Sequence, residues 1–277
     1  MSVNVFIILL FAACLHASWN AIIKSGSNKH MTTCLVTTTA AIIALIFLPF
    51  LPQPHLSSWP YLACSVVLQI IYFSLIAKTY HVTDMAQSYP LMRGTAPFLV
   101  AIFSTVVLAE KLHFGAWCGI TLICLGIFAI IARWHQKNRI GIYLTFINAV
   151  VIASYTLIDG IGVRASHSPI AYTLWIYLLT GLVLGVWMLK TQKMTFIAYA
   201  QKNWHLGLMG GIGSIISYAL ALWAMTLYPI AMISAFRETS ILFALLISRF
   251  MLKEKFSLNR IIAAIFIFTG AMLLKLS

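Results

Sequence analysis

The sequence contains very few acidic residues and few charged residues of any kind. Only five of its 277 residues are Asp or Glu, and charged residues make up 8% of the chain. Soluble domains carry about 25% charged residues, so this composition excludes an ordinary soluble domain. Hydrophobic residues reach 62%, and several apolar runs have the roughly 20 residues that cross a bilayer. The composition therefore predicts a polytopic membrane protein.

The chain also lacks the motifs of hydrolytic, nucleotide-driven and metal chemistry. It contains no GxxxxGK[ST], HExxH or GxSxG sequence, and its few acids form no catalytic pair. The five cysteines form no CxxC and lie in apolar runs, which is typical of small packing residues. We therefore expect no enzyme activity, no metal site and no cofactor.

The net charge of +13 comes mainly from basic residues in short connections between the apolar runs. Such residues orient membrane spans and contact anionic lipid headgroups. No basic stripe with exposed aromatic rings remains for nucleic acid. The expected partners are the lipid bilayer and a small-molecule substrate, with no nucleic acid, and the protein is either a monomer or a homodimer.

The apolar runs predict an all-α integral membrane fold with ten transmembrane helices. Pro, Gly, Asn and His residues punctuate the short connections. The longest connection, at 190–204, has room for a short interfacial helix. The expected spans are 3–23, 31–52, 58–80, 84–109, 113–133, 140–161, 169–189, 205–227, 229–252 and 257–276.

Lys and Arg are distributed unevenly between the two sides of these spans. Thirteen lie in the odd-numbered connections and three lie on the opposite side. Because positive residues favour the cytoplasmic side, we expect both chain termini to be extracytoplasmic. The expected location is a bacterial inner membrane, crossed many times.

The sequence repeats internally. RGTAPFLVAIFSTVVLAEK at 93–111 aligns without gaps with RETSILFALLISRFMLKEK at 237–255. A weaker match sets HASWNAI at 16–22 against IASYTLI at 152–158. The ten spans therefore form two related sets of five.

Five is an odd number, so the second set of spans must be inverted in the membrane relative to the first. The expected repeats are residues 1–135 and 136–277. Inverted repeats are a transporter architecture, with the substrate site near the bilayer midplane where the repeats meet.

Arg93 and Arg237 occupy equivalent positions in the repeats and stand inside apolar runs. Each lies roughly 12–14 Å into its span, near the bilayer centre, where a charge costs about 2.5–3.5 kcal/mol or more. Two guanidinium groups at one interior site suit a carboxylate, phosphate or phosphonate. The alternative is structural, because an internal ion pair with Asp159, or capping of carbonyls at a broken helix, would satisfy either arginine.

Aromatic and polar residues near the arginines are further candidates for substrate binding. His16 and Asn20 share a helix face beside Trp19, and Tyr155 matches Trp19 in the repeat. Aromatic walls with a few polar groups suit a small solute, and aromatic rings also hold ammonium groups. Ordinary helix packing, or a satisfied interior histidine, explains these residues equally. The remaining candidates are Tyr89, Tyr218 and Trp223.

Two prolines and three acids complete the candidate residues. Pro90 and Pro97 lie in the same predicted helix as the first arginine and favour a bend there, although packing alone also explains such a kink. Glu238, Asp159 and Asp84 are the candidates for coupling or gating. Asp159 falls near the end of its predicted span, which favours an interfacial position.

These features resemble the EamA branch of the drug/metabolite transporter superfamily. HASWNAIIKSG in span one, YPLMRGTAPFLVAI in span four and the Glu-Lys pairs that close spans four and nine carry the likeness. The resemblance implies two five-helix halves and secondary transport of small organic solutes. The small four-helix relatives couple to protons through a glutamate in their first span. Span one of this chain contains no acid, so that coupling scheme is not carried over.

The sequence thus favours a secondary transporter that works by alternating access. Its expected substrate is a small polar organic metabolite with an anionic group, such as an amino acid or a related compound. The alternatives are an exporter of cationic or drug-like compounds and a lipid-precursor translocase of the same fold. A groove open to lipid would favour the translocase. Glu110 and Glu254, which close spans four and nine, are expected to form loop or gate contacts.

Overall fold

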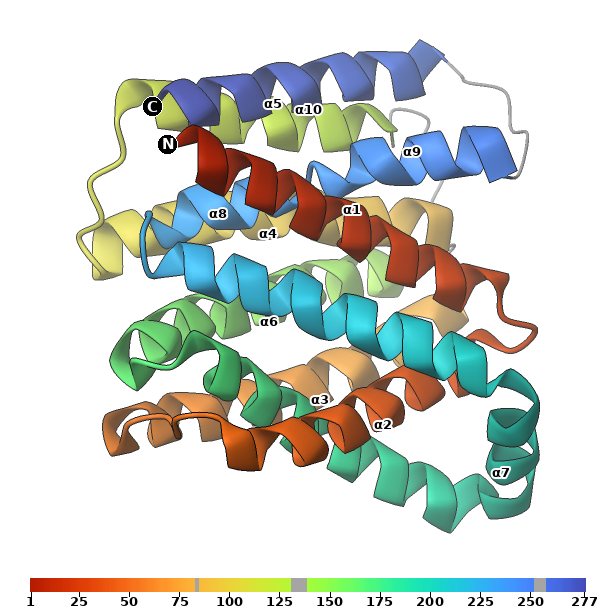
Figure 1. Ribbon diagram of the computed structural model, residues 1–277. Helices are drawn as coiled ribbons and strands as arrows, with labels where there is room; N and C mark the ends of the chain where they lie inside the picture. Colours follow the sequence, from red (N-terminus) through yellow and green to blue (C-terminus); the bar gives the residue numbers. More distant parts are fainter. Residues whose placement is uncertain (83–84, 131–138, 252–257) are drawn as a thin grey trace.

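Long helices, packed side by side, form the whole of the described structure. It is a computed structural model that describes residues 1–82, 85–130, 139–251 and 258–277. All regular elements in these ranges are helical, and their axes run roughly along one direction in a single bundle (Figure 1). The predicted all-α membrane fold is confirmed.

The helical elements match the predicted spans closely in position. They are α1 (Val3–Ser25), α2 (Lys29–Phe47), η1 (Leu48–Phe50), η2 (Leu56–Ser58), α3 (Trp59–Val82), α4 (Met85–Val107), α5 (Phe114–Ile130), α6 (Arg139–Ser166), α7 (Pro169–Met225), α8 (Ile230–Arg237), α9 (Ser240–Met251) and α10 (Leu258–Leu276). The predicted boundary between residues 135 and 136 lies outside the described residues.

Two elements differ from single straight spans. Helix α7 has 57 residues but leaves helical geometry at Gln192 and Asn203, and the chain turns back on itself there (Figure 1). It therefore contains predicted spans seven and eight, with the expected short helix between them. Predicted span nine is divided into α8 and α9 by a turn at Glu238 and Thr239.

The termini lie together at one end of the bundle (Figure 1). The amino group of Met1 donates to the carbonyl oxygen of Lys275 at 2.8 Å, and the backbone N–H of Ser2 donates to the Tyr228 hydroxyl at 2.9 Å. This arrangement is consistent with the even number of spans that the sequence predicts. Eight helical stretches among the described residues are long and apolar enough to cross a membrane, with α7 counted once and α8 joined to α9, and α5 is a shorter apolar helix. The count of ten stays a prediction.

Helix packing shows the repeat in three dimensions. Helix α3 packs on α6 as α7 packs on α1, and α5 packs on α10. The first helices of the two repeats, α1 and α6, run in opposite directions (Figure 1). At the α5–α10 seam, a Cβ atom added to Gly119 would lie 2.8 Å from the Gly270 carbonyl oxygen, and one added to Gly126 would lie 3.0 Å from that of Ala263. In the repeat alignment Gly119 corresponds to Ala263 and Gly126 to Gly270, so the two contacts are equivalent to each other.

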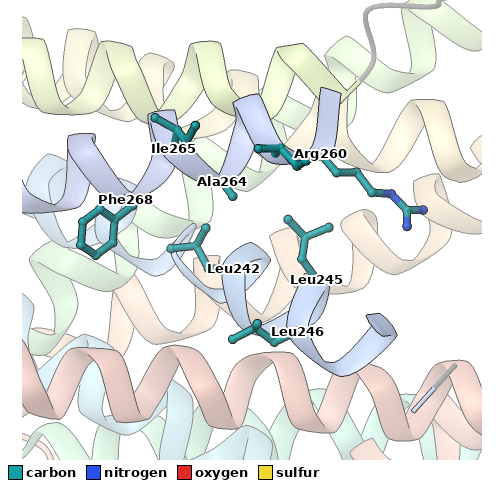
Figure 2. Close-up of a pocket in the computed structure, with 8 residues that line it drawn as sticks. Leu242, Leu245, Leu246, Arg260, Ala264, Ile265 and Phe268 are labelled. Atoms are coloured by element: carbon teal, nitrogen blue, oxygen red, sulfur yellow. The ribbon is translucent and has the colours of Figure 1, made fainter. Parts of the chain in front are cut away.

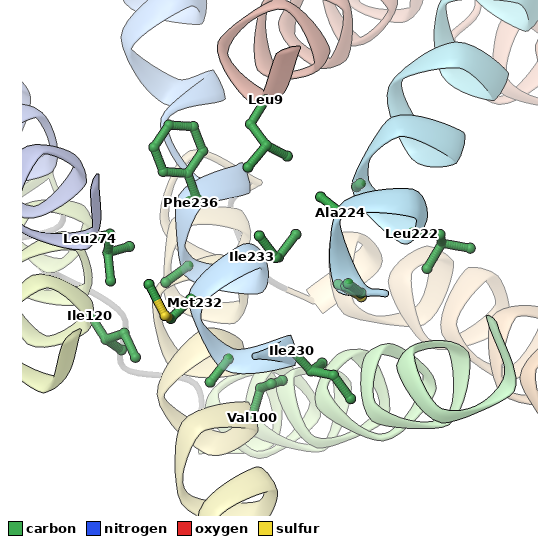
Figure 3. Packing of buried hydrophobic residues seen from close by; sticks show 14 of the residues in the cluster. Leu9, Val100, Ile120, Leu222, Ala224, Ile230, Met232, Ile233, Phe236 and Leu274 are labelled. Atoms are coloured by element: carbon green, nitrogen blue, oxygen red, sulfur yellow. The ribbon is translucent and has the colours of Figure 1, made fainter. Parts of the chain in front are cut away.

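The main hydrophobic core surrounds the short helix α8. Ile233 and Phe236 of this helix face Leu9 of α1, while Ile120 of α5 and Leu274 of α10 lie on its other side (Figure 3). Every residue from 230 to 236 is buried, as expected for a helix that is apolar on all sides. The core therefore fixes the position of the chain just before the turn at Glu238.

Candidate solute-binding site

Charged and aromatic side chains from five helices meet at the turn between α8 and α9. We call this group the central cluster, and it draws on α1, α4, α6, α7 and α8. Its members are linked by ion pairing, hydrogen bonding, ring contact or electrostatic interaction, and they are His16, Arg93, Tyr155, Asp159, Tyr218, Arg237 and Glu238.

Arg93 forms an ion pair with Glu238. Its Nη2 atom lies 2.7 Å from Oε1 of Glu238, and its Nε–H donates to Oε2 at 3.1 Å. Both residues are buried, with 8% and 4% of their surface exposed. The structural alternative raised by the sequence therefore holds for Arg93, with Glu238 as the partner in place of Asp159.

At the end of α8, the side chains of two neighbouring residues point in different directions. Arg237 is the last residue of α8, and Glu238 is its C-cap. Successive residues on a helix diverge by about 100° and do not face each other. Glu238 accordingly reaches α4, whereas Arg237 reaches Tyr218 on α7.

Arg237 lies against an aromatic ring that is itself bound to an acid. Its guanidinium carbon is 4.9 Å from the centre of the Tyr218 ring, within the range of a cation–π interaction. The Tyr218 hydroxyl donates to Oδ2 of Asp159, and the Tyr172 hydroxyl donates to Oδ1 at 3.4 Å. The fully buried Ser65 lies near the Asp159 carboxylate. The Asp159 carboxylate is thus held by hydroxyl groups.

The two arginines differ in their charge balance. Within the described part of the chain, no carboxylate lies within ion-pair distance of Arg237, while Arg93 has Glu238. Arg237 is also only partly buried. Both guanidinium groups act electrostatically on His16 and Tyr155. The cluster therefore combines an arginine that has a direct acidic partner with one that interacts with Asp159 and Glu238 only at longer range.

The other predicted substrate-binding residues lie at different distances from this centre. His16 and Trp19 contact each other edge to face at 5.2 Å, and the Asn20 amide donates to the His16 carbonyl oxygen at 2.8 Å. Tyr155 packs edge to face on Tyr72 at 5.9 Å.

Three further predicted residues stand apart from the cluster or cannot be placed. Trp223 packs against the main hydrophobic core. Asp84 and the side chain of Tyr89 lie outside the described residues.

Asp159 and the prolines occupy different settings from those the sequence favoured. Asp159 is fully buried, because α6 continues to Ser166 and carries this residue inside the bundle. Helix α4 runs without interruption through Pro90 and Pro97. The helix break beside an arginine is found instead in the second repeat, which has no proline there.

Sequence reasoning missed three polar residues inside the bundle. Tyr172 donates to Asp159 and Ser65 lies near it. Asn148 is fully buried, and neither of its amide atoms has a hydrogen-bond partner among the described residues. The buried indole Nε1–H of Trp19 likewise has no hydrogen-bond partner in the described part of the chain. Buried polar groups are normally paired with protein or water. An isolated polar residue within an apolar run was the available signal for Asn148.

Glu110 and Arg164 close the end of the bundle that holds the termini. Their side chains form an ion pair of 2.8 Å, and Glu110 also accepts the backbone N–H of Ile230 at 3.0 and 3.1 Å. Arg164 donates to the carbonyl oxygens of Met225 and Tyr228. This network, which we call the terminal latch, ties the α4–α5 connection to α6 and to the start of α8.

The repeat packing, the apolar helices and the buried charged cluster together define a membrane transporter of the inverted-repeat type. The family model of the EamA-like transporter family matches residues 4–132 and 139–276. The chain therefore belongs to the EamA-like transporter family, within the drug/metabolite transporter superfamily.

Comparison with solved structures agrees on the fold. One solved structure, titled "Crystal structure of protein", matches with a TM-score of 0.78 and 16% sequence identity, over 100% of this chain and 98% of the other. At this identity the match shows the fold alone. No curated protein matches. Among the described residues, no group of three or more His, Cys, Asp or Glu side chains is placed to hold a metal ion.

Proposed function

We propose that the protein is a secondary transporter for a small polar metabolite with an anionic group, such as an amino acid or a related compound. Arg237 is the residue that binds the anionic group. The observation that carries the proposal is the difference between the arginines: Glu238 neutralises Arg93, whereas Arg237 has an aromatic contact and no ion pair in the described structure. A carboxylate binds a guanidinium group through two parallel hydrogen bonds.

Neighbouring groups supply the remainder of the site. Tyr218 holds the Arg237 guanidinium from one side, so an incoming carboxylate meets a preorganised cation. His16 and Tyr155 lie within the field of both arginines, and Trp19 offers an unused indole N–H. A solute with one anionic group and a short polar or apolar body suits this set of contacts.

Alternating access supplies the transport step in this proposal. The terminal latch supports it, because Glu110 links parts of both repeats at one end of the bundle. In the repeat alignment Glu254 corresponds to Glu110, and it lies outside the described residues. We infer that Glu110 serves the gate at the terminal side.

A lipid-facing groove between α9 and α10 bears on the alternative of a lipid-precursor translocase. Apart from Arg260, its lining residues are all apolar: Leu242, Leu245, Leu246, Ile261, Ala264, Ile265 and Phe268. A polar headgroup crossing the bilayer along this groove would lose its hydration without gaining hydrogen bonds. A groove open to lipid is the feature expected of the translocase, but its apolar lining argues against passage of a polar headgroup along it.

The test is solute binding and uptake by the purified protein. Lactate, L-alanine and tetramethylammonium serve as anionic, zwitterionic and cationic probes in a thermal-shift assay, followed by a wider metabolite screen and uptake into liposomes. Carboxylate-bearing solutes should stabilise and be transported by the wild type and the Arg139→Gln control, which changes an exposed arginine at the start of α6. Arg237→Gln should lose both effects.

Two results would contradict the proposal. Stabilisation by tetramethylammonium alone would favour the exporter of cationic compounds. Unchanged carboxylate uptake by Arg237→Gln would show that this arginine does not hold the solute.

A further inference from the structure

The groove between α9 and α10 marks a departure from the symmetry of the two repeats. In the first repeat, α4 packs closely on α5, whereas α8 and α9, which together correspond to α4, have little contact with α10. The space between them has a volume of about 470 Å³. Side chains from both helices border it on facing sides (Figure 2).

Equivalent positions in the two repeats differ in how exposed their side chains are. Arg260 corresponds to Ala116, which is 1% exposed and packed in the core, and Phe268 corresponds to Cys124, which is 4% exposed. Phe268 itself is 56% exposed, and Arg260 is only partly buried. At these two positions the second repeat therefore carries larger and more exposed side chains than the first.

The groove has a charged residue at one end and an apolar lining along its length, which matches the headgroup and acyl chain of a phospholipid. Arg260 lies in the first turn of α10, and Phe268 lies eight residues further along, which is about 12 Å deeper at 1.5 Å per residue. One leaflet of the hydrocarbon core is about 15 Å thick. A chain that starts at Arg260 and follows the groove to Phe268 thus covers most of one leaflet (Figure 2).

Arg260 is suited to an anionic headgroup. Its side chain extends from the end of the groove, away from the leucine and isoleucine side chains (Figure 2). A guanidinium group has five N–H donors, so it can bind a phosphate oxygen while keeping a contact with the protein. Arg249 lies at the C-terminal end of α9 and adds positive charge on the same side of the bundle.

We propose that the α9–α10 groove is a binding site for one anionic phospholipid. One acyl chain lies between Leu242, Leu246 and Phe268, and the phosphate contacts Arg260. The site is separate from the central cluster, and the lipid is a bound component and not a transported solute. Because α9 begins immediately after the turn at Glu238, the lipid supports a helix whose packing against α10 is otherwise weak.

The test measures lipid binding by the purified, delipidated full-length protein. Dioleoyl phosphatidylglycerol and dioleoyl phosphatidylcholine are added separately, bound lipids are counted by native mass spectrometry, and thermal unfolding is followed in parallel. The wild type should retain phosphatidylglycerol about fivefold better than phosphatidylcholine, the effect expected of one arginine near a lipid surface. Arg260→Ala, which restores the residue of the first repeat, should remove this preference.

A second variant and a control separate the groove from general charge effects. Leu246→Trp places a larger side chain in the groove and should reduce binding of both lipids, and Leu246 is 47% exposed, so folding tolerates the change. Arg139→Ala removes an exposed arginine elsewhere on the basic side and should leave the preference intact.

Three outcomes would overturn the proposal. They are equal retention of both lipids by the wild type, an unchanged preference in Arg260→Ala, and a doubled mass that Leu246→Trp returns to the monomer. The last result would identify a second copy of the chain as the occupant of the groove.

Discussion

Removing one partner of the Arg93–Glu238 pair should destabilise the protein far more than removing both. The two side chains are 10% and 5% exposed and 2.7 Å apart. At an effective dielectric constant of about 20, charges at this separation attract by about 6 kcal/mol. Burial of each ion costs several kcal/mol, so attraction and desolvation nearly cancel for the intact pair. The loss of one partner leaves the other charge buried without compensation.

The expected values follow from this balance. Arg93→Met and Glu238→Gln should each lower the free energy of unfolding by about 3–5 kcal/mol. The double variant Arg93→Met with Glu238→Leu should lose much less than the sum, because apolar residues of similar volume replace a buried pair at little net cost.

The assay is a double-variant cycle measured by denaturant unfolding in detergent micelles, with Glu238→Leu as the second single variant. A coupling free energy of about 2 kcal/mol or more is expected for two residues in direct contact. Additive effects of the single variants would refute the reasoning, since they would mean that neither charge depends on the other.

Three further changes test other parts of the structure. Tyr218→Phe removes the hydroxyl that binds Asp159 and should lower the free energy of unfolding by about 1.5–3 kcal/mol. Solute-induced thermal shifts should persist, because the ring beside Arg237 remains. Loss of these shifts would show that the ring alone does not hold Arg237 for the solute. Glu110→Gln should lower the free energy of local opening at the terminal latch by about 1 kcal/mol. Backbone hydrogen exchange at the start of α8 should then be about fivefold faster, and unchanged exchange would argue against a latch. Gly270→Ala brings a Cβ within 2.6 Å of the Gly119 carbonyl oxygen and should lower the free energy of unfolding by about 1–3 kcal/mol. The control Gly213→Ala, whose nearest contact is at 3.5 Å, should be neutral or slightly stabilising. Equal effects of the two changes would refute close packing at the α5–α10 seam.

The fold was predictable because the local amino-acid composition determines which segments can span a membrane. Long apolar runs and basic connections mark the helices, and the register of 93–111 against 237–255 already relates the two repeats. The short helix between the kinks of α7 was also visible, as a polar connection of unusual length. The turn that divides α8 from α9 was not, since no proline or glycine marks it.

The site was predictable only in part. Isolated arginines in apolar runs identified Arg93 and Arg237 as interior residues, because hydrocarbon does not tolerate their charge. Which of them has an acidic partner depends on the turn after α8, which points Glu238 toward α4. Tyr172 and Ser65 had no distinctive sequence signal, and they reach Asp159 only through the packing of α3 and α7 on α6.

The sequence by itself determined the class of fold, the repeat and the presence of buried charge, because these depend on composition and on spacing along one chain. The tertiary structure decided the pairing of charges, the burial of Asp159 and the opening of one helix seam while its repeat counterpart is closed. Those features depend on distances between helices that are far apart in the chain. Arg93 and Arg237 are equivalent in the sequence, and only the three-dimensional arrangement gives one of them an ion pair and leaves the other beside an aromatic ring.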